Sequence, residues 1–318
     1  MDWIEQVFSL GQQWLFEGVV SPLMFMAGFG NRLEDGYTAT GWLLVGLLQL
    51  AVIVGVIVPL QRWRPAEAVI DRAAIRTDIV YTLIHRLGLF RVALFLLVEP
   101  VFDAGWGVLR TAGWPTFHLD QVWPGVTDLA WVSLLIYLVV FDLADYWIHR
   151  GQHQFRWWWA LHSLHHSQRQ MTAWSDNRNH LLDDLIRDSL LVLLAQAIGV
   201  APGQFVAIVA ITQLSENLQH ANLRIAFGRW GRGLWVSPCF HRRHHAIGIG
   251  HERADSRALG GCNFGVLLPW WDRIFGTANF EDRYEPTGIR DQVEQGRDYG
   301  RGFWSQQWLG LRRLAGRD

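Results

Sequence analysis

A run of twenty uncharged residues, GWLLVGLLQLAVIVGVIVPL at 41–60, limits what this chain can fold into. An α-helix rises 1.5 Å per residue, so a run of this length spans the roughly 30 Å hydrocarbon core of a bilayer. The following loop, residues 61–77, carries four arginines, and the positive-inside rule therefore places it in the cytoplasm. The chain is predicted to be an integral membrane protein.

Two further segments predict membrane spans. Residues 79–99 are apolar but contain one histidine and two arginines, and such groups in a span usually face a cavity or a partner. Residues 127–148 predict a third span, which returns the chain to the cytoplasmic side at His149. The intervening residues 101–126 are rich in Gly, Pro and Trp and are expected to form an outer loop.

Another apolar segment, residues 189–214, is interrupted by Gly199, Pro202 and Gly203. Each half has about 11 residues, too few to cross a bilayer, so we expect a short hairpin that enters the membrane and returns to the same side. A full crossing is the alternative, but it would separate the histidines before and after the segment. The predicted fold class is all-α: an integral membrane helical bundle with about three transmembrane helices, this re-entrant hairpin and a cytoplasmic histidine-rich cap.

Amphipathic segments flank these spans. Residues 3–16 predict an interfacial helix or, equally well, a core-facing one, and residues 302–318 have an arginine-bearing pattern suited to the inner leaflet. We divide the chain into an N-terminal membrane region (1–126), a histidine-rich region (127–280) and a C-terminal cytoplasmic tail (281–318).

Histidines provide the strongest functional signal. Eight of the thirteen fall in three clusters with helical spacing: His149 and His153; His162, His165 and His166; and His241, His244 and His245. Residues three and four apart share a face of a helix, so each cluster directs its imidazoles to one side. Neutral imidazole is a common metal ligand, and eight exceed the four ligands of a structural zinc. Two metal ions with open positions are therefore the simplest interpretation.

Several other functions lack their sequence signatures. The chain contains no HExxH metalloprotease motif and no GxSxG nucleophile motif. Its net charge is -1, and it has no basic stripe with interleaved aromatics, so we expect no nucleic-acid partner. We find no glycine-rich dinucleotide motif and no cysteine set for an iron–sulfur cluster. Redox chemistry would therefore need electrons from a separate donor.

Four stretches occur in a characteristic order: DLADYWIHRGQH (142–153), WALHSLHHS (159–167), SPCFHRRHH (237–245) and NFGVLLPWWDRIFGT (263–277). With this order and spacing, the chain resembles the fatty acid hydroxylase/sterol desaturase superfamily over about residues 140–280. The resemblance implies a membrane-embedded helical fold and a non-haem centre of two Fe ions facing the cytoplasm. It also implies O2-dependent hydroxylation, desaturation or ether cleavage of a lipid. The electron donor would be a reductase, a ferredoxin, a haem protein or a pterin.

The resemblance also assigns residues outside the three clusters. His220, in ENLQHAN, is expected to be a ninth metal ligand. His180 matches a recurrent Arg-x-His element, which would make it an extra ligand or a neighbour of the ligands. Glu216, one helical turn before His220, would either bind a metal or support a ligand.

Three more residues match the superfamily motifs and have two interpretations each. Asp142 and Asp272 are expected to accept an imidazole N–H and so to fix its tautomer, although pairing with an arginine or capping a helix fits equally well. Asn263 would either hydrogen-bond a metal-bound water or form a turn.

Two other functions are compatible with the histidines. A zinc-dependent membrane hydrolase or isomerase would act without O2 or reductant. A metal transporter or sensor would need polar residues along a continuous path through the spans, where we find only His85, Arg86 and Arg91. We prefer the membrane-bound di-iron oxygenase, whose substrate would be a sterol, a fatty acyl chain or a related lipid.

Overall fold

The computed structural model describes residues 2–115, 117–247 and 261–317. Every regular element in these parts is a helix, and an isolated bridge pairs Ala246 with Thr287. The all-α class is therefore confirmed, whereas the division into three regions stays a prediction.

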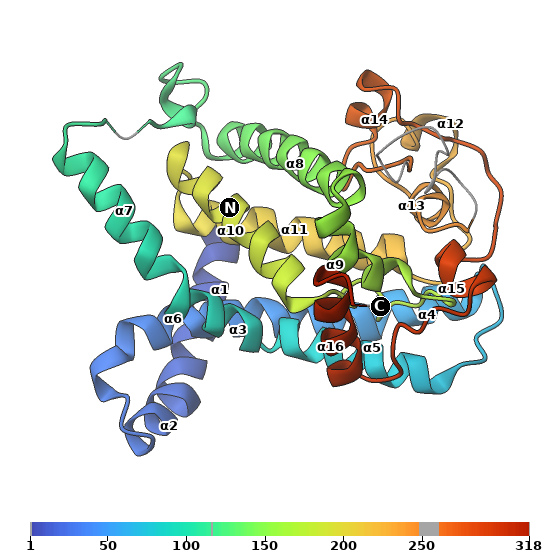
Figure 1. Ribbon diagram of the computed structural model, residues 1–318. Coiled ribbons are helices and arrows are strands. Elements are labelled where there is room, and N and C mark those ends of the chain that lie inside the picture. The colour runs from blue at the N-terminus through green and yellow to red at the C-terminus, as the bar shows by residue number, and fades with distance from the viewer. Residues whose placement is uncertain (1, 116, 248–260, 318) are drawn as a thin grey trace.

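Residues 2–63 form two long helical stretches. The first contains α1 (Asp2–Leu15), η1 (Phe16–Val20) and α2 (Ser21–Met26). The second contains η2 (Gly30–Arg32), α3 (Leu33–Val52), η3 (Ile53–Ile57) and α4 (Val58–Trp63). The two stretches fold back on each other, so that α1 packs against α3 (Figure 1).

Two helical stretches are long and apolar enough to cross a membrane. They are residues 30–63, which contain the predicted span at 41–60, and α8 (Ala130–Gln154), which contains most of the span predicted at 127–148. Only 22% and 33% of their most apolar windows are buried inside the protein. The core helix of a soluble protein would be mostly buried, so these exposed apolar surfaces favour a lipid environment.

The span predicted at 79–99 is wrong as a continuous helix. α5 (Arg72–Arg86) and α6 (Leu89–Leu97) are separate, because Gly88 has a φ of 76°, a left-handed conformation that glycine adopts without strain. The side chain of Arg86 is buried within the bundle, as expected for a charged group in an otherwise apolar segment.

The predicted outer loop at 101–126 is also partly wrong, because α7 (Glu99–Thr111) occupies its first half. A short turn, η4 (Leu119–Gln121), then leads into α8. In Figure 1, α7 stands at one side of the molecule and a loop connects it to α8.

The predicted hairpin consists of two full-length helices, α10 (Leu181–Ala197) and α11 (Pro202–His220). The arms have 17 and 19 residues, more than predicted, because the helices continue into the polar sequence on both sides. Pro202 begins α11, where its missing N–H leaves no helical hydrogen bond unmade. The hairpin returns the chain to the end of the bundle where α10 began.

The helices around the histidines are α9 (Arg156–His166) and α13 (Pro238–His244), followed by the short α14 (Trp270–Ile274) and α15 (Arg290–Glu294). A four-residue helix, α12 (Gly228–Gly231), precedes α13. The C-terminal α16 (Phe303–Leu314) packs against α9 and α5. Figure 1 shows α9, α13 and the ends of α8 and α11 together at one end of the bundle.

Candidate metal centre

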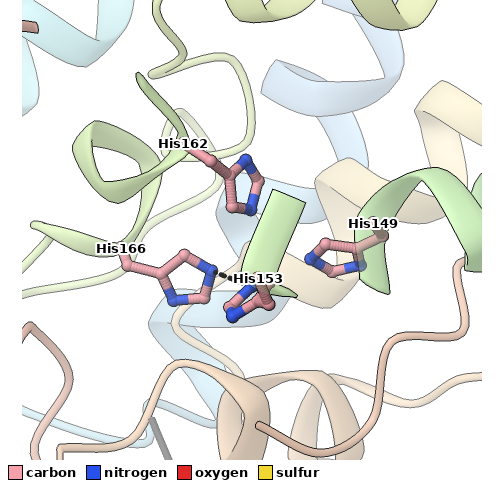
Figure 2. Close-up of side chains that lie close together, drawn as sticks. All are labelled: His149, His153, His162 and His166. Carbon is pink, nitrogen blue, oxygen red and sulfur yellow. Dashed lines mark hydrogen bonds between the residues drawn. The ribbon is translucent and has the colours of Figure 1, made fainter. Parts of the chain in front are cut away.

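Nine imidazoles from four parts of the chain meet at this end of the bundle, and all nine side chains are buried. A first group consists of His149, His153, His162 and His166, and a second group consists of His165, His220, His241 and His245. The ligand atoms of each group lie within 4.8 Å of one another. The ninth residue, His244, lies close to His149 and His153, with ring centroids 4.4 and 4.7 Å away. Figure 2 shows the first group, whose rings point toward one another.

The spacing within each HxxHH motif explains why two groups form. Successive residues of an α-helix are rotated by about 100°, so positions i+3 and i+4 lie on opposite sides of position i. On α9, His162 and His166 accordingly belong to the first group and His165 to the second. The motif of residues 241–245 divides in the same way, with His244 turned toward the first group.

In the second group, the Nε2 atoms make more contacts with one another than their single lone pairs or protons can satisfy as hydrogen bonds. His220 Nε2 lies 3.0 Å from His165 Nε2 and 2.9 Å from His241 Nε2, and His241 Nε2 is 3.2 Å from His245 Nε2. His220 Nδ1 donates to the carbonyl oxygen of Glu216 at 2.8 Å, so its Nε2 has only one lone pair to offer two neighbours. Two nitrogens bound to one metal ion at about 2.1 Å and at right angles are about 3 Å apart. The distances therefore fit a shared metal ion.

The first group shows the same convergence. His153 Nε2 lies 3.1 Å from His166 Nε2, the contact drawn as a dashed line in Figure 2. The Nε2 of His162 is buried and has no hydrogen-bond partner among the described residues, while its Nδ1 is engaged elsewhere. A buried imidazole nitrogen left in this way is suited to a metal ion.

Four of the imidazoles outside the candidate spans have a strongly lowered pKa. Burial, followed by the neighbouring histidines, lowers the pKa of His165, His166, His241 and His245 well below the usual value of 6.5. Neutral imidazole is the form that binds metal ions, so metal binding need not displace protons from these rings near pH 7.

Comparison with known proteins agrees with this geometry. The sequence profile of the fatty acid hydroxylase family matches residues 134–277. An ornithine lipid hydroxylase of Rhizobium tropici is 27% identical over 183 residues, which cover 57% of this chain and 52% of that protein. An alkylglycerol monooxygenase of Danio rerio is 29% identical over 165 residues, covering 52% of this chain and 33% of that protein. Residues 134–277 therefore resemble the fatty acid hydroxylase/sterol desaturase superfamily.

A third relative, a Delta(7)-sterol 5(6)-desaturase of Gibberella zeae, is 24% identical over 146 residues and covers 46% of this chain and 41% of that protein. The chain thus spans about half the length of these superfamily members, or less. No solved structure matches it significantly. The family match at 134–277 contains all nine clustered histidines.

The superfamily motifs also contain Asp142 and Asp272, and neither carboxylate has the expected imidazole contact. Asp142 accepts the backbone N–H groups of Leu267 and Leu268 and the indole N–H of Trp271 at 2.7–3.0 Å. Asp272 accepts two further backbone N–H groups, from 264 and 265, and a threonine hydroxyl from 277. Each carboxylate thus accepts three hydrogen bonds. They hold the loop whose Phe264 carbonyl oxygen accepts the Nδ1–H of His149 at 3.0 Å.

Two other superfamily positions, Asn263 and Glu216, lie beside the clustered histidines rather than among them. Asn263 has a φ of 59° and its amide bonds the backbone of Phe240 and Asn279, so it forms the turn. Glu216 contacts His220 through its backbone, while its carboxylate lies 3.4 Å from the Arg187 guanidinium.

His180 is not brought into either group. Its Nδ1 accepts the N–H of Leu182 at the start of α10, and its Nε2 donates to the carbonyl oxygen of Gln307 in α16 at 2.9 Å. With both nitrogens engaged, this residue caps one helix and anchors another.

Sequence reasoning missed Asp183 and Asp176. Asp183 accepts the Nδ1–H of His162 at 2.9 Å, and Asp176 lies 3.3 Å from His220 Nδ1. Both occur in the polar stretch at 175–184, so a search of the neighbouring sequence for carboxylates would have found them as candidates.

One cavity reaches the centre, and a second cavity adjoins it. The larger, about 80 Å³, is bounded by histidines of both groups and by charged residues. The other, about 40 Å³, has mostly apolar walls from α6, α8, α10 and α11, including Leu94, Phe141 and Ile208. Asp145 and Arg187, joined by a 2.9 Å ion pair, lie on the wall of both cavities.

Proposed function

We propose that this protein is a membrane-bound non-haem di-iron oxygenase that hydroxylates or desaturates a lipid, using O2 and electrons from a separate donor. The observation that carries the proposal is the pair of buried, converging imidazole groups. The nine clustered histidines would hold the two irons, because their converging nitrogens and their spacing suit an N-ligated transition metal. The named activities of the relatives, lipid hydroxylation, alkylglycerol oxygenation and sterol desaturation, support a lipid substrate.

When bound, the iron pair would supply the O2 chemistry that oxidises an unactivated C–H bond. The protein would supply a dry, fixed environment. The mostly apolar cavity between α6, α8, α10 and α11 is small, so it would take only a short part of a hydrocarbon chain, next to the histidine-lined cavity.

The membrane arrangement is part of the proposal. Residues 30–63 and α8 would cross the bilayer, and the α10–α11 hairpin would enter it and return. The arginine-rich loop after residue 60 would lie in the cytoplasm, with the metal centre on the same side. The exposed indoles of Trp304 and Trp308 on α16 suit contact with the inner leaflet.

Lipid mass spectrometry of cells with and without the protein tests the proposed activity. We expect one lipid class to gain an oxygen atom or lose two hydrogen atoms when the protein is present. The same conversion should require O2, reductant and iron in the purified protein. Turnover without O2 and reductant would instead support a zinc hydrolase or isomerase, and metal uptake into sealed vesicles would support a transporter.

A further inference from the structure

The oxygen atoms that accept hydrogen bonds from the imidazole Nδ1 atoms differ between the two histidine groups. Within the described part of the chain, four of the nine clustered imidazoles direct Nδ1 at an oxygen atom, and three of these oxygens are neutral backbone carbonyls. These three pairs are His149 with Phe264, His220 with Glu216, and His244 with Cys262, at 3.0, 2.8 and 2.6 Å. The fourth, His162 in the first group, donates to the carboxylate of Asp183.

Asp183 is almost completely buried, and its other hydrogen-bond partners among the described residues are neutral. Its Oδ1 accepts the indole N–H of Trp158 at 2.7 Å and the amide N–H of Gln152 at 2.8 Å, while Oδ2 accepts from His162. The negative charge of Asp183 therefore acts on the first group through its hydrogen bond with His162.

Asp176, the carboxylate nearest to the second group, has a different environment. It lies 3.3 Å from His220 Nδ1, which already donates to a carbonyl oxygen, and 3.3 Å from the guanidinium of the buried Arg86. The positive charge of Arg86 partly cancels the negative charge of Asp176, so this carboxylate has a weaker electrostatic effect on the second group.

A carboxylate that accepts the N–H of a ligating histidine fixes its tautomer and makes the imidazole a stronger donor to the metal. We propose that Asp183 is a positioning residue that makes the two metal sites unequal, so that the first group binds its ion more tightly than the second. This inference rests on the proposed two-metal centre. It concerns the difference between the two sites, which the oxygenase activity alone would not reveal.

Cobalt titration of the metal-free protein tests this inference, because bound Co²⁺ gives visible absorption bands and needs no O2, electrons or lipid. We expect two binding steps in the wild-type protein. Asp183→Asn should weaken the tighter step by about 10–100-fold and leave the weaker step unchanged. Mössbauer spectra of the iron-loaded variant should likewise change for one of two iron environments.

Trp158→Phe is the matched control. It removes one hydrogen bond to the same carboxylate and disturbs the same α9–α10 contact, but it keeps the negative charge beside His162. Both cobalt affinities should therefore stay close to those of the wild type. An equal loss in Trp158→Phe would show that Asp183 acts only through packing.

Equal weakening of both steps in Asp183→Asn, or no weakening, would overturn the inference. If Asp183→Asn does not fold, Asp183→Glu keeps the charge but moves it, and we expect a smaller loss confined to the tighter step. Wild-type affinities in Asp183→Glu would then count against the inference. A wild-type protein that binds two cobalt ions but oxidises no lipid would refute the oxygenase function and leave this test intact.

Discussion

The histidines of this protein differ in their contacts, although they look alike in the sequence. Nine converge in the metal centre, whereas His180 caps α10 and anchors α16. The clustered residues are distributed over two groups by the i, i+3, i+4 spacing, so each HxxHH motif contributes to both. This part of the site was predictable, because helical periodicity fixes the directions of neighbouring side chains. The contacts of Asp142, Asp183 and His180 were not, because they depend on which loops and helices pack together.

His165→Ala should remove one ligand from the second group while leaving the first group complete. We expect the purified variant to retain roughly half of the wild-type iron and to lose lipid oxidation, because ligand removal weakens metal binding strongly. His118→Ala is the control, since the ring of His118 lies beside Gly199, in the turn between α10 and α11. Iron content equal to that of the wild type in His165→Ala would refute its role as a ligand.

Helices set the positions of these residues. The points at which a helix is interrupted were harder to predict from the sequence than the presence of the helix. Apolar windows correctly indicated α3 and α8, because long uncharged runs leave few alternatives to a helix. The separation of α5 from α6 depends on one left-handed residue, Gly88, which an averaged hydropathy window does not detect. The same separation lets the end of α5 face the bundle interior.

Gly46→Ala should disturb the contact between α3 and α5. A Cβ atom at Gly46 would overlap the backbone oxygen of Arg86, whose guanidinium bonds Asn217 and approaches Asp176. We expect a loss of stability of about 1–3 kcal/mol in a detergent unfolding experiment, together with weaker iron retention. Gly55→Ala is the matched control, because no atom lies within 4 Å of a Cβ there. Equal stability of the two variants would contradict the close α3–α5 contact.

α16 should be anchored by the steric fit of Gly310 against the ring of His180. Gly310→Ala would overlap that ring, whereas His180→Ala would create room but lose the hydrogen bond to the Gln307 carbonyl. The double variant should therefore lose less free energy of unfolding than the two single variants added together, by about 0.5–3 kcal/mol. Thermal unfolding of the four proteins measures this coupling. Simple additivity would mean that α16 does not dock on His180.

On the scale of the whole molecule, one end carries the nine imidazoles and the rest of the bundle exposes apolar helices. The buried imidazole nitrogens of each group converge on one another, and a bound cation would satisfy their lone pairs. A bound metal should therefore stabilise the folded protein, as any ligand specific for the native state does. This coupling between metal and fold distinguishes a built metal centre from histidines that only fill space.

Chelation should lower the unfolding temperature of the purified protein in detergent. We expect ferrous iron to restore it and Mg²⁺ to have no effect, because imidazole suits transition metals and hard cations prefer oxygen ligands. A protein with both groups disrupted, His165→Ala with His162→Ala, should show no response to iron. A response unchanged in that double variant would place the stabilising metal elsewhere.

We infer that two metal ions share these imidazoles, one in each group. An experimental structure of the iron-loaded protein, with anomalous scattering measured at the iron absorption edge, would locate them. We expect two anomalous peaks, one among His149, His153, His162 and His166, and one among His165, His220, His241 and His245. A single peak, or peaks outside both groups, would contradict it.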